Sequence, residues 1–114
     1  FSNSKVVGGH RASRAVFLPA FQAAKKTRLW LSGHAHGYEH FLKEGRHYVI
    51  SAGGGGARQP LAESREHQDL YRGEFPRPFN YLLLRQVGTA LVIDTLGWDR
   101  SWPKPRAIDR ITIE

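Results

Sequence analysis

Short apolar segments that end in glycine or turn residues dominate this chain after residue 27. Six of them have the length and composition of β-strands, at 28–32, 38–42, 47–51, 80–87, 90–96 and 108–113. One segment before them has apolar residues at helical spacing, and we expect a helix from its N-cap, Ser13, to about Lys26. The pattern predicts a single α+β unit, residues 1–114, that is mostly β-sheet with one main helix.

Local signals refine this prediction. Pro19 removes a hydrogen-bond donor inside the expected helix, so we expect a kink or a restart there. Turn residues at 43–45 and 88–89 predict two hairpins, and we expect a long surface loop at 57–79. Trp98 and Trp102 suggest a tail packed on the sheet. The predicted apolar stripe of the helix consists of Val16, Phe17, Ala20, Phe21 and Ala24.

Composition narrows the function classes. The chain has no Cys, which excludes disulfides, thiolate metal sites and cysteine nucleophiles. No apolar run approaches the roughly 20 residues of a membrane helix. The formal charge of +7 favours phosphate-bearing partners. The basic residues are scattered, however, which disfavours a nucleic-acid footprint.

The strongest functional signal is His34-Ala35-His36, which follows an apolar strand and lies between Gly33 and Gly37. Residues i and i+2 of an extended backbone point the same way, about 6–7 Å apart. Two imidazoles at a strand end can therefore bind one metal ion, or one ion each of a pair about 3.5–4 Å apart. Two polar loop residues are the alternative interpretation of such a pair.

The longer string Leu31-Ser-Gly-His-Ala-His-Gly-Tyr-Glu-His40 resembles the Gly-His-x-His motif of the calcineurin-like metallophosphoesterases, especially their purple-acid-phosphatase-like branch. The segments 48–56 and 1–4 are similar to the stretches that accompany that motif in the family. The resemblance covers residues 1 to about 97. It implies the C-terminal half of a four-layer αββα sandwich. It also implies that His34 binds one metal ion and His36 the other, that the ions are of the Fe, Zn or Mn type, and that the substrate is a phosphate ester.

The other metal-binding motifs of the family, Asp-x-His, Gly-Asp-x-x-Asp and Gly-Asn-His, are not in this sequence. We therefore expect a piece of a longer phosphoesterase that is inactive by itself and binds metal weakly or not at all. Half of a sandwich would also expose a sheet face that favours self-association. A non-enzymatic structural or interaction domain is the alternative, and a basic nucleic-acid-binding module is a less favoured one.

Further candidates surround the motif. The resemblance implies that His10 contacts the substrate phosphate or protonates the leaving group; an exposed loop histidine is the alternative. Lys5 and Arg11 are further candidates for phosphate binding. We expect His40 either to support a ligand from behind or to be structural. Glu39 either orients a ligand histidine or is a surface carboxylate. The Gly53–Gly56 run is either an anion-binding nest or, as we favour, a place where the backbone passes close to a neighbour. An aromatic lid is conceivable from Tyr71, Phe75 and Phe79, although core filling is the preferred role.

Overall fold

The computed structural model describes residues 2–61, 69–73 and 77–114. Within these residues it contains one helix and six strands, as the sequence predicted. In chain order they are α1 (Arg11–Ala23), β1 (Leu29–Ser32), β2 (Tyr38–Lys43), β3 (Arg46–Ser51), β4 (Phe79–Val87), β5 (Ala90–Trp98) and β6 (Arg106–Ile113).

The strands form two three-stranded sheets. The first has the order β1-β3-β2, in which β1 is parallel to β3 and β2 is antiparallel to it. The second, β4-β5-β6, is antiparallel throughout. The predicted hairpins are confirmed. Glu44 and Gly45 have φ of 52° and 69° in the β2–β3 turn, the left-handed pair of a two-residue hairpin turn.

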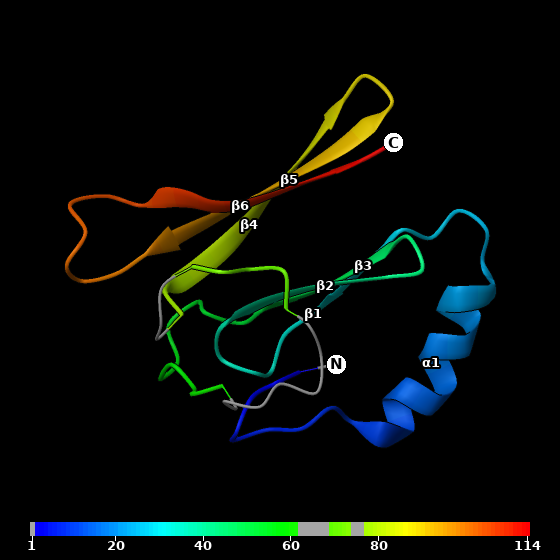
Figure 1. The fold of residues 1–114 in the computed structure, drawn as a ribbon, viewed down its shortest axis with the longest axis horizontal. Coiled ribbons are helices and arrows are strands. Elements are labelled where there is room, and N and C mark those ends of the chain that lie inside the picture. Colours follow the sequence, from blue (N-terminus) through cyan, green and yellow to red (C-terminus); the bar gives the residue numbers. More distant parts are fainter. Residues whose placement is uncertain (1, 62–68, 74–76) are drawn as a thin grey trace.

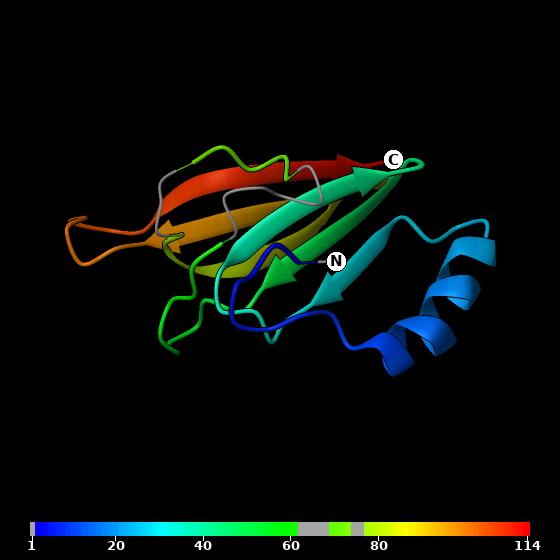
Figure 2. The same cartoon turned by 60° about the horizontal axis from the view of Figure 1, so that its bottom comes forward.

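The elements stack in three layers, which are α1, the first sheet and the second sheet (Figures 1 and 2). Tyr38, Val49, Ile93 and Ile111 form the core between the two sheets, together with Tyr71 from the loop before β4. A second core lies between the first sheet and α1, where Leu18 and Phe21 pack against buried sheet residues. The α+β architecture expected for half of an αββα sandwich is therefore present.

The helix differs from its prediction at both ends. His10, rather than Ser13, is the N-cap, because the His10 imidazole accepts a hydrogen bond from the Ser13 backbone N–H at 3.2 Å. The helix ends at Ala23, before the lysines. Thr27 lies beyond that end, and its hydroxyl donates back to the carbonyls of Phe21 and Ala24. Because α1 continues through Pro19, no restart occurs there.

The predicted apolar stripe of α1 was wrong in part. Val16 and Phe17 are 67% and 59% exposed, whereas Leu18 and Phe21 contact the core. The Phe21 ring meets Trp30 and Tyr48 edge-on, with centroids 5.2 and 5.6 Å away. These ring contacts set the face of the helix that packs against the sheet, and this face is rotated from the one that the spacing indicated.

Two further predictions needed correction. Trp98 and Trp102 do not lie on a tail, because residues 106–113 form a full strand and place Trp102 in the β5–β6 connection. In that connection the Arg106 guanidinium lies 3.6 Å from the Trp102 ring centroid. The segment 57–79 is not simply a surface loop either, since Asp69 and Arg77 are almost fully buried.

The outer face of the second sheet carries exposed apolar side chains, including Tyr81, Leu83 and Val87. Asp94 lies among them and is held by Arg85 and Arg110. Hydrogen bonds from Arg110 and Arg85 lower the pKa of Asp94. The face for which we expect self-association is the one that meets another sheet, and that face is covered here, because the two sheets pack against each other. Self-association itself stays a prediction. In the described part of the chain, no helix has the length and apolar character needed to span a membrane.

Candidate metal and substrate site

The His-x-His motif lies where β1 leaves the first sheet. In β1, Leu29 packs against the core between the sheets and Trp30 packs against the core under the helix, whereas Leu31 is exposed and the strand ends at Ser32. His34 has a φ of 74°, a left-handed conformation that is uncommon for a residue with a side chain. This turn exposes His34, while Ala35 is buried and His36 is partly buried. The two histidines therefore occupy different environments.

Three hydrogen bonds hold His36, one through its ring and two through its backbone. Its imidazole Nδ1 lies 3.0 Å from the Ala57 carbonyl oxygen, which can only accept, so Nδ1 carries the proton. Gln59 brackets the His36 backbone: its side-chain oxygen accepts from the His36 N–H at 3.1 Å, and its backbone N–H donates to the His36 carbonyl at 2.9 Å. The ring is therefore fixed with the Nε2 lone pair available, which is the state of a metal-binding histidine.

The glycine run lets the following loop pass over this ring. A methyl group on Gly56 would lie 2.5 Å from His36 Cε1 and 2.6 Å from Nδ1, too close for any real contact. A methyl group on Gly53 would lie even closer to Asn80, whereas nothing lies within 4 Å of one on Gly54 or Gly55. Close approach to a neighbour, the favoured interpretation of Gly53–Gly56, describes two of the four glycines.

This packing leads to a matched pair of substitutions. Gly56→Ala should displace the His36 ring and destabilise the protein by about 1–3 kcal/mol, as overpacking does. Gly54→Ala should change stability by less than about 0.5 kcal/mol, because nothing lies within 4 Å of its added methyl group. The measurement is urea unfolding, combined with the NMR chemical shifts of the His36 ring. Equal behaviour of the two variants would contradict the close packing of Gly56 on His36.

His10 and His34 line the same cavity, which has a volume of about 450 Å³. It lies between the N-terminal half of α1 and the first sheet. Its apolar wall includes Leu18, Trp30 and Tyr48, and its polar residues include Ser13 and Arg14. The structure thus places His10 and His34 on one cavity, while Lys5 and Arg11 do not line it. His36 lies beside the cavity, under the glycine loop.

His10 is oriented by its capping role. The Ser13 backbone N–H donates to His10 Nδ1, so this nitrogen is unprotonated and the neutral ring carries its proton on Nε2. The Ser13 hydroxyl lies 2.7 Å from the same Nδ1. His10 can therefore donate a hydrogen bond from Nε2. The sequence indicated a candidate phosphate contact here, and the cap geometry supplies the tautomer that such a contact requires.

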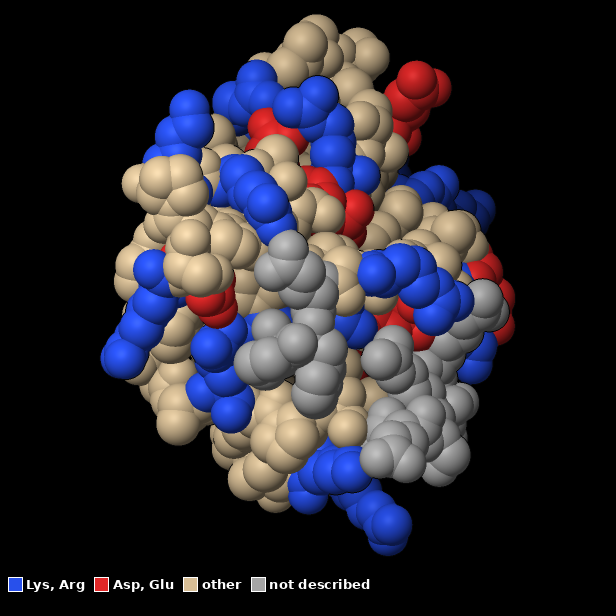
Figure 3. All heavy atoms as spheres, turned by 60° about the vertical axis from the view of Figure 1, so that its left-hand side comes forward, with Lys and Arg blue, Asp and Glu red and all other residues tan. Residues whose placement is uncertain are grey.

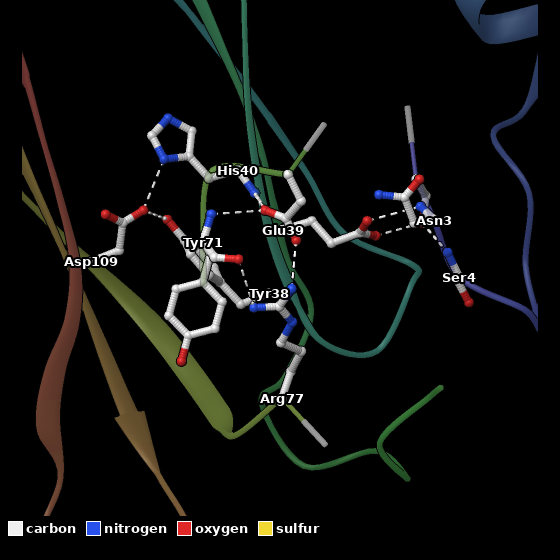
Figure 4. Close-up of polar contacts among 10 residues, drawn as sticks. Asn3, Ser4, Tyr38, Glu39, His40, Tyr71, Arg77 and Asp109 are labelled. Atoms are coloured by element: carbon white, nitrogen blue, oxygen red, sulfur yellow. Dashed lines mark hydrogen bonds and ion pairs between the residues drawn. The ribbon is translucent and has the colours of Figure 1, made fainter. Parts of the chain in front are cut away.

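Glu39 and His40 do not position the ligand histidines. The two carboxylate oxygens of Glu39 accept from the Ser2 hydroxyl at 2.6 Å and from the Asn3 backbone N–H at 2.8 Å. Glu39 thus fastens the N-terminal segment next to the motif, as Figure 4 shows. His40 faces the second sheet, where its Nδ1 lies 2.8 Å from Asp109. Sequence spacing gave no signal for either contact, because both partners are more than thirty residues away.

The aromatic lid is not supported. Tyr71 is buried in the core between the sheets, as the preferred prediction held, and Phe79 begins β4. The Phe79 ring contacts Trp98, with centroids 5.9 Å apart. Phe75 lies outside the described residues.

The donor set for a metal ion is partial. The described residues contain no group of three or more His, Asp or Glu side chains that could hold a metal ion. His36 fits a metal ligand by its fixed tautomer, and His34 is exposed near it. These two imidazoles supply no bridging carboxylate, which a hard dinuclear centre requires.

No family model matches this sequence, and no curated protein matches it. Among solved structures, the chain is similar to the crystal structure of a single mutant of Vps29 from Entamoeba histolytica, with a TM-score of 0.56 and 16% identity. The similarity covers 100% of this chain and 53% of that chain, so this chain spans about half the length of the Vps29 structure. Vps29 has the calcineurin-like metallophosphoesterase fold, and at this identity the likeness shows the fold alone.

Proposed function

We propose that this chain is the C-terminal part of a metal-dependent phosphoesterase, in which His34 and His36 bind the two metal ions. The observation that carries the proposal is the His36 ring, whose Nδ1–H donates to the Ala57 carbonyl and leaves Nε2 for a metal. The position of the motif at a strand end, in a metallophosphoesterase fold, supports it. When bound, such ions lower the pKa of a bound water and neutralise phosphoryl oxygens.

The residues of this chain would bind and orient the substrate. The cavity beside His34 accommodates the organic part of a phosphate ester against Trp30 and Leu18. Arg14 lines the same cavity and brings a positive charge toward the phosphate. His10, with its proton on Nε2, is placed to donate a hydrogen bond from this N–H to the leaving-group oxygen or to a phosphoryl oxygen.

The donor set suggests that this chain needs further ligands for turnover. Two neutral imidazoles bind divalent ions weakly, so we expect less than two equivalents of bound metal after dialysis and no hydrolysis by residues 1–114 alone. Elemental analysis of the dialysed chain measures this. Two retained equivalents would contradict the proposed dependence on carboxylates from elsewhere.

The test of the activity uses the longer protein that supplies those carboxylates. Replacing both His34 and His36 with Ala should abolish hydrolysis of a chromogenic aryl phosphate, because each metal ion loses a ligand. His10→Ala should lower kcat by about 10²–10³-fold, the usual cost of removing a hydrogen-bond donor to developing negative charge, and leave metal content unchanged. Turnover that survives the loss of both histidines would exclude the proposed metal site.

The second candidate function is a non-enzymatic structural or interaction domain. The absence of a third ligand among the described residues favours it. A basic nucleic-acid-binding module has less support, since Figure 3 shows Lys and Arg on one face interspersed with acidic and uncharged residues. Nucleic-acid affinity that falls steeply with salt would support that module instead.

A further inference from the structure

A chain of polar side chains connects the two sheets at the buried end of β2. Asp109 on β6 accepts hydrogen bonds from the Tyr38 hydroxyl at 2.7 Å and from His40 Nδ1 at 2.8 Å. The other His40 nitrogen, Nε2, lies 2.9 Å from Nδ1 of His47 on β3. Figure 4 shows Tyr38, His40 and Asp109 converging between the sheets. His40 is 5% exposed, whereas His47 reaches the boundary with solvent.

The Asp109 carboxylate fixes which groups donate and which accept among these side chains. The Asp109 carboxylate can only accept, so His40 Nδ1 carries a proton. When both rings are neutral, His40 Nε2 must accept, and His47 Nδ1 must donate. Each of the facing polar atoms of Asp109, His40 and His47 then has a hydrogen-bond partner. Protons from solvent enter at the outer nitrogen of His47, Nε2.

One added proton leaves all the hydrogen bonds among Asp109, His40 and His47 in place. When His47 Nε2 takes up a proton, the proton on His47 Nδ1 can move to His40 Nε2. His40 is then an imidazolium next to the Asp109 carboxylate, and neutral His47 accepts its hydrogen bond. The facing nitrogens of the two rings thus share one added proton. A second added proton leaves N–H groups on both facing nitrogens, 2.9 Å apart, and this contact becomes repulsive.

We propose that Asp109, His40 and His47 form a proton-operated latch. In it, Asp109 holds His40 across the two sheets, and His47 holds His40 within the first sheet. The His40–His47 bond is closed with zero or one added proton and is opened by the second. The latch links β6 to β2 and β3 and does not depend on the proposed phosphoesterase activity. Loss of the His40–His47 bond would remove a side-chain link between β2 and β3 and place a second buried charge beside the contact between the sheets, which destabilises the fold.

The charged neighbours of the latch are consistent with this behaviour. The Arg110 backbone N–H donates to the other Asp109 oxygen at 2.8 Å. Arg72 and Arg106 line a cavity of about 400 Å³ together with Asp109. Asp69 contributes a negative charge near Tyr38, on the side of the loop before β4. The hydrogen bonds from His40, Tyr38 and the Arg110 backbone N–H keep Asp109 charged.

The directions of the pKa shifts define the pH window. Burial and the positive charge of His40 lower the pKa of His47, so the unfolded chain binds a proton that the folded chain resists. Stability is therefore complete above the ordinary histidine range, about pH 6.5, and falls as the pH drops below it. Burial alone would raise the pKa of Asp109, but the bonds from His40 and Tyr38 lower it, so its contribution is lost only under more acidic conditions, below about pH 4.

The test compares His47→Gln with the unmodified chain by urea unfolding from about pH 7.5 to about pH 5. The Gln amide can donate to His40 Nε2 but cannot take up the second proton. The folding constant of the unmodified chain should fall faster than that of His47→Gln, by up to about tenfold per pH unit for the one proton involved.

Nitrogen NMR of the folded, unmodified chain gives an independent readout. At neutral pH, both His40 and His47 should carry their proton on Nδ1, and on acidification one proton should be taken up by the pair before the other. A proton on Nε2 of neutral His40, or independent titration of the two rings, would overturn the latch. So would parallel pH profiles of His47→Gln and the unmodified chain.

Discussion

Replacing Arg77 with Met should lower the free energy of unfolding by about 3–5 kcal/mol, the cost of leaving a buried charge without its partner. Arg77 donates to Asp69 at 2.7 Å, and both side chains are almost completely buried. The Arg77 guanidinium also donates to the Tyr71 carbonyl at 3.1 Å and lies 4.4 Å from the Tyr71 ring centroid. Met fills a similar volume, so the loss measures the charge and its hydrogen bonds.

The effect should extend beyond the pair, because Asp69 closes the free edge of β2. One Asp69 oxygen accepts from the backbone N–H groups of His40 and Tyr71, both at 3.0 Å. The Leu70 N–H donates back to the His40 carbonyl at 2.7 Å. Figure 4 shows His40, Tyr71 and Arg77, the partners of Asp69, close together at β2. Without Arg77, the loop that satisfies this edge carries an uncompensated carboxylate in the core.

Arg85→Met is the matched control for Arg77. Arg85 also pairs with an aspartate, Asp94, but its side chain is 46% exposed and Asp94 keeps Arg110 as a second partner. Its loss should change stability by about 1 kcal/mol or less. Urea unfolding at neutral pH measures both variants. A cost for Arg77→Met no larger than that for Arg85→Met would show that the buried pair does not stabilise the fold.

Gly53→Ala should destabilise the protein by about 3 kcal/mol or more, since overpacking and lost hydrogen bonds act together. A methyl group on Gly53 would lie 2.8 Å from the backbone nitrogen of Asn80 and even closer to its side-chain amide. Asn80 cannot yield, because its N–H donates to the Gly53 carbonyl and its side-chain oxygen accepts from the Ser51 hydroxyl. These bonds join the end of β3 to the start of β4.

Gly54→Ala provides the neighbouring control, with an expected change below about 0.5 kcal/mol. Thermal unfolding and hydrogen exchange of the amides in β3 and β4 measure the difference. Exchange should become faster at the β3–β4 junction in Gly53→Ala and stay unchanged in Gly54→Ala. If the two variants have the same midpoint, the close approach of Gly53 to Asn80 does not constrain the junction.

The strands were predictable because their signals are local. Apolar runs, turn residues and glycines specify β2, β3, β4 and β5 to within a few residues, and the two hairpins follow from the turns between them. The packed face of α1 was not predictable in the same way. Its rotation depends on the rings of Trp30 and Tyr48, which reach the helix only after the sheet has formed.

The candidate site also combines features that local sequence predicts with features that depend on tertiary contacts. The sequence identified His34 and His36 from their spacing and His10 from a resemblance, and the structure places His10 and His34 on one cavity. It did not identify Gln59, which brackets His36, or the partners of Glu39. Polar residues such as these are common in loops, and no periodicity marks the ones that will meet a distant backbone.

The sequence by itself determined the strand segments, the hairpins and the two imidazoles at a strand end, because propensity and spacing act over a few residues. Only the tertiary structure decided the tautomer of His36, the burial of Asp69 with Arg77 and the link from His47 through His40 to Asp109. Each of these depends on groups that lie far apart in the chain. Their charges and hydrogen bonds become strong only when folding removes water from between them.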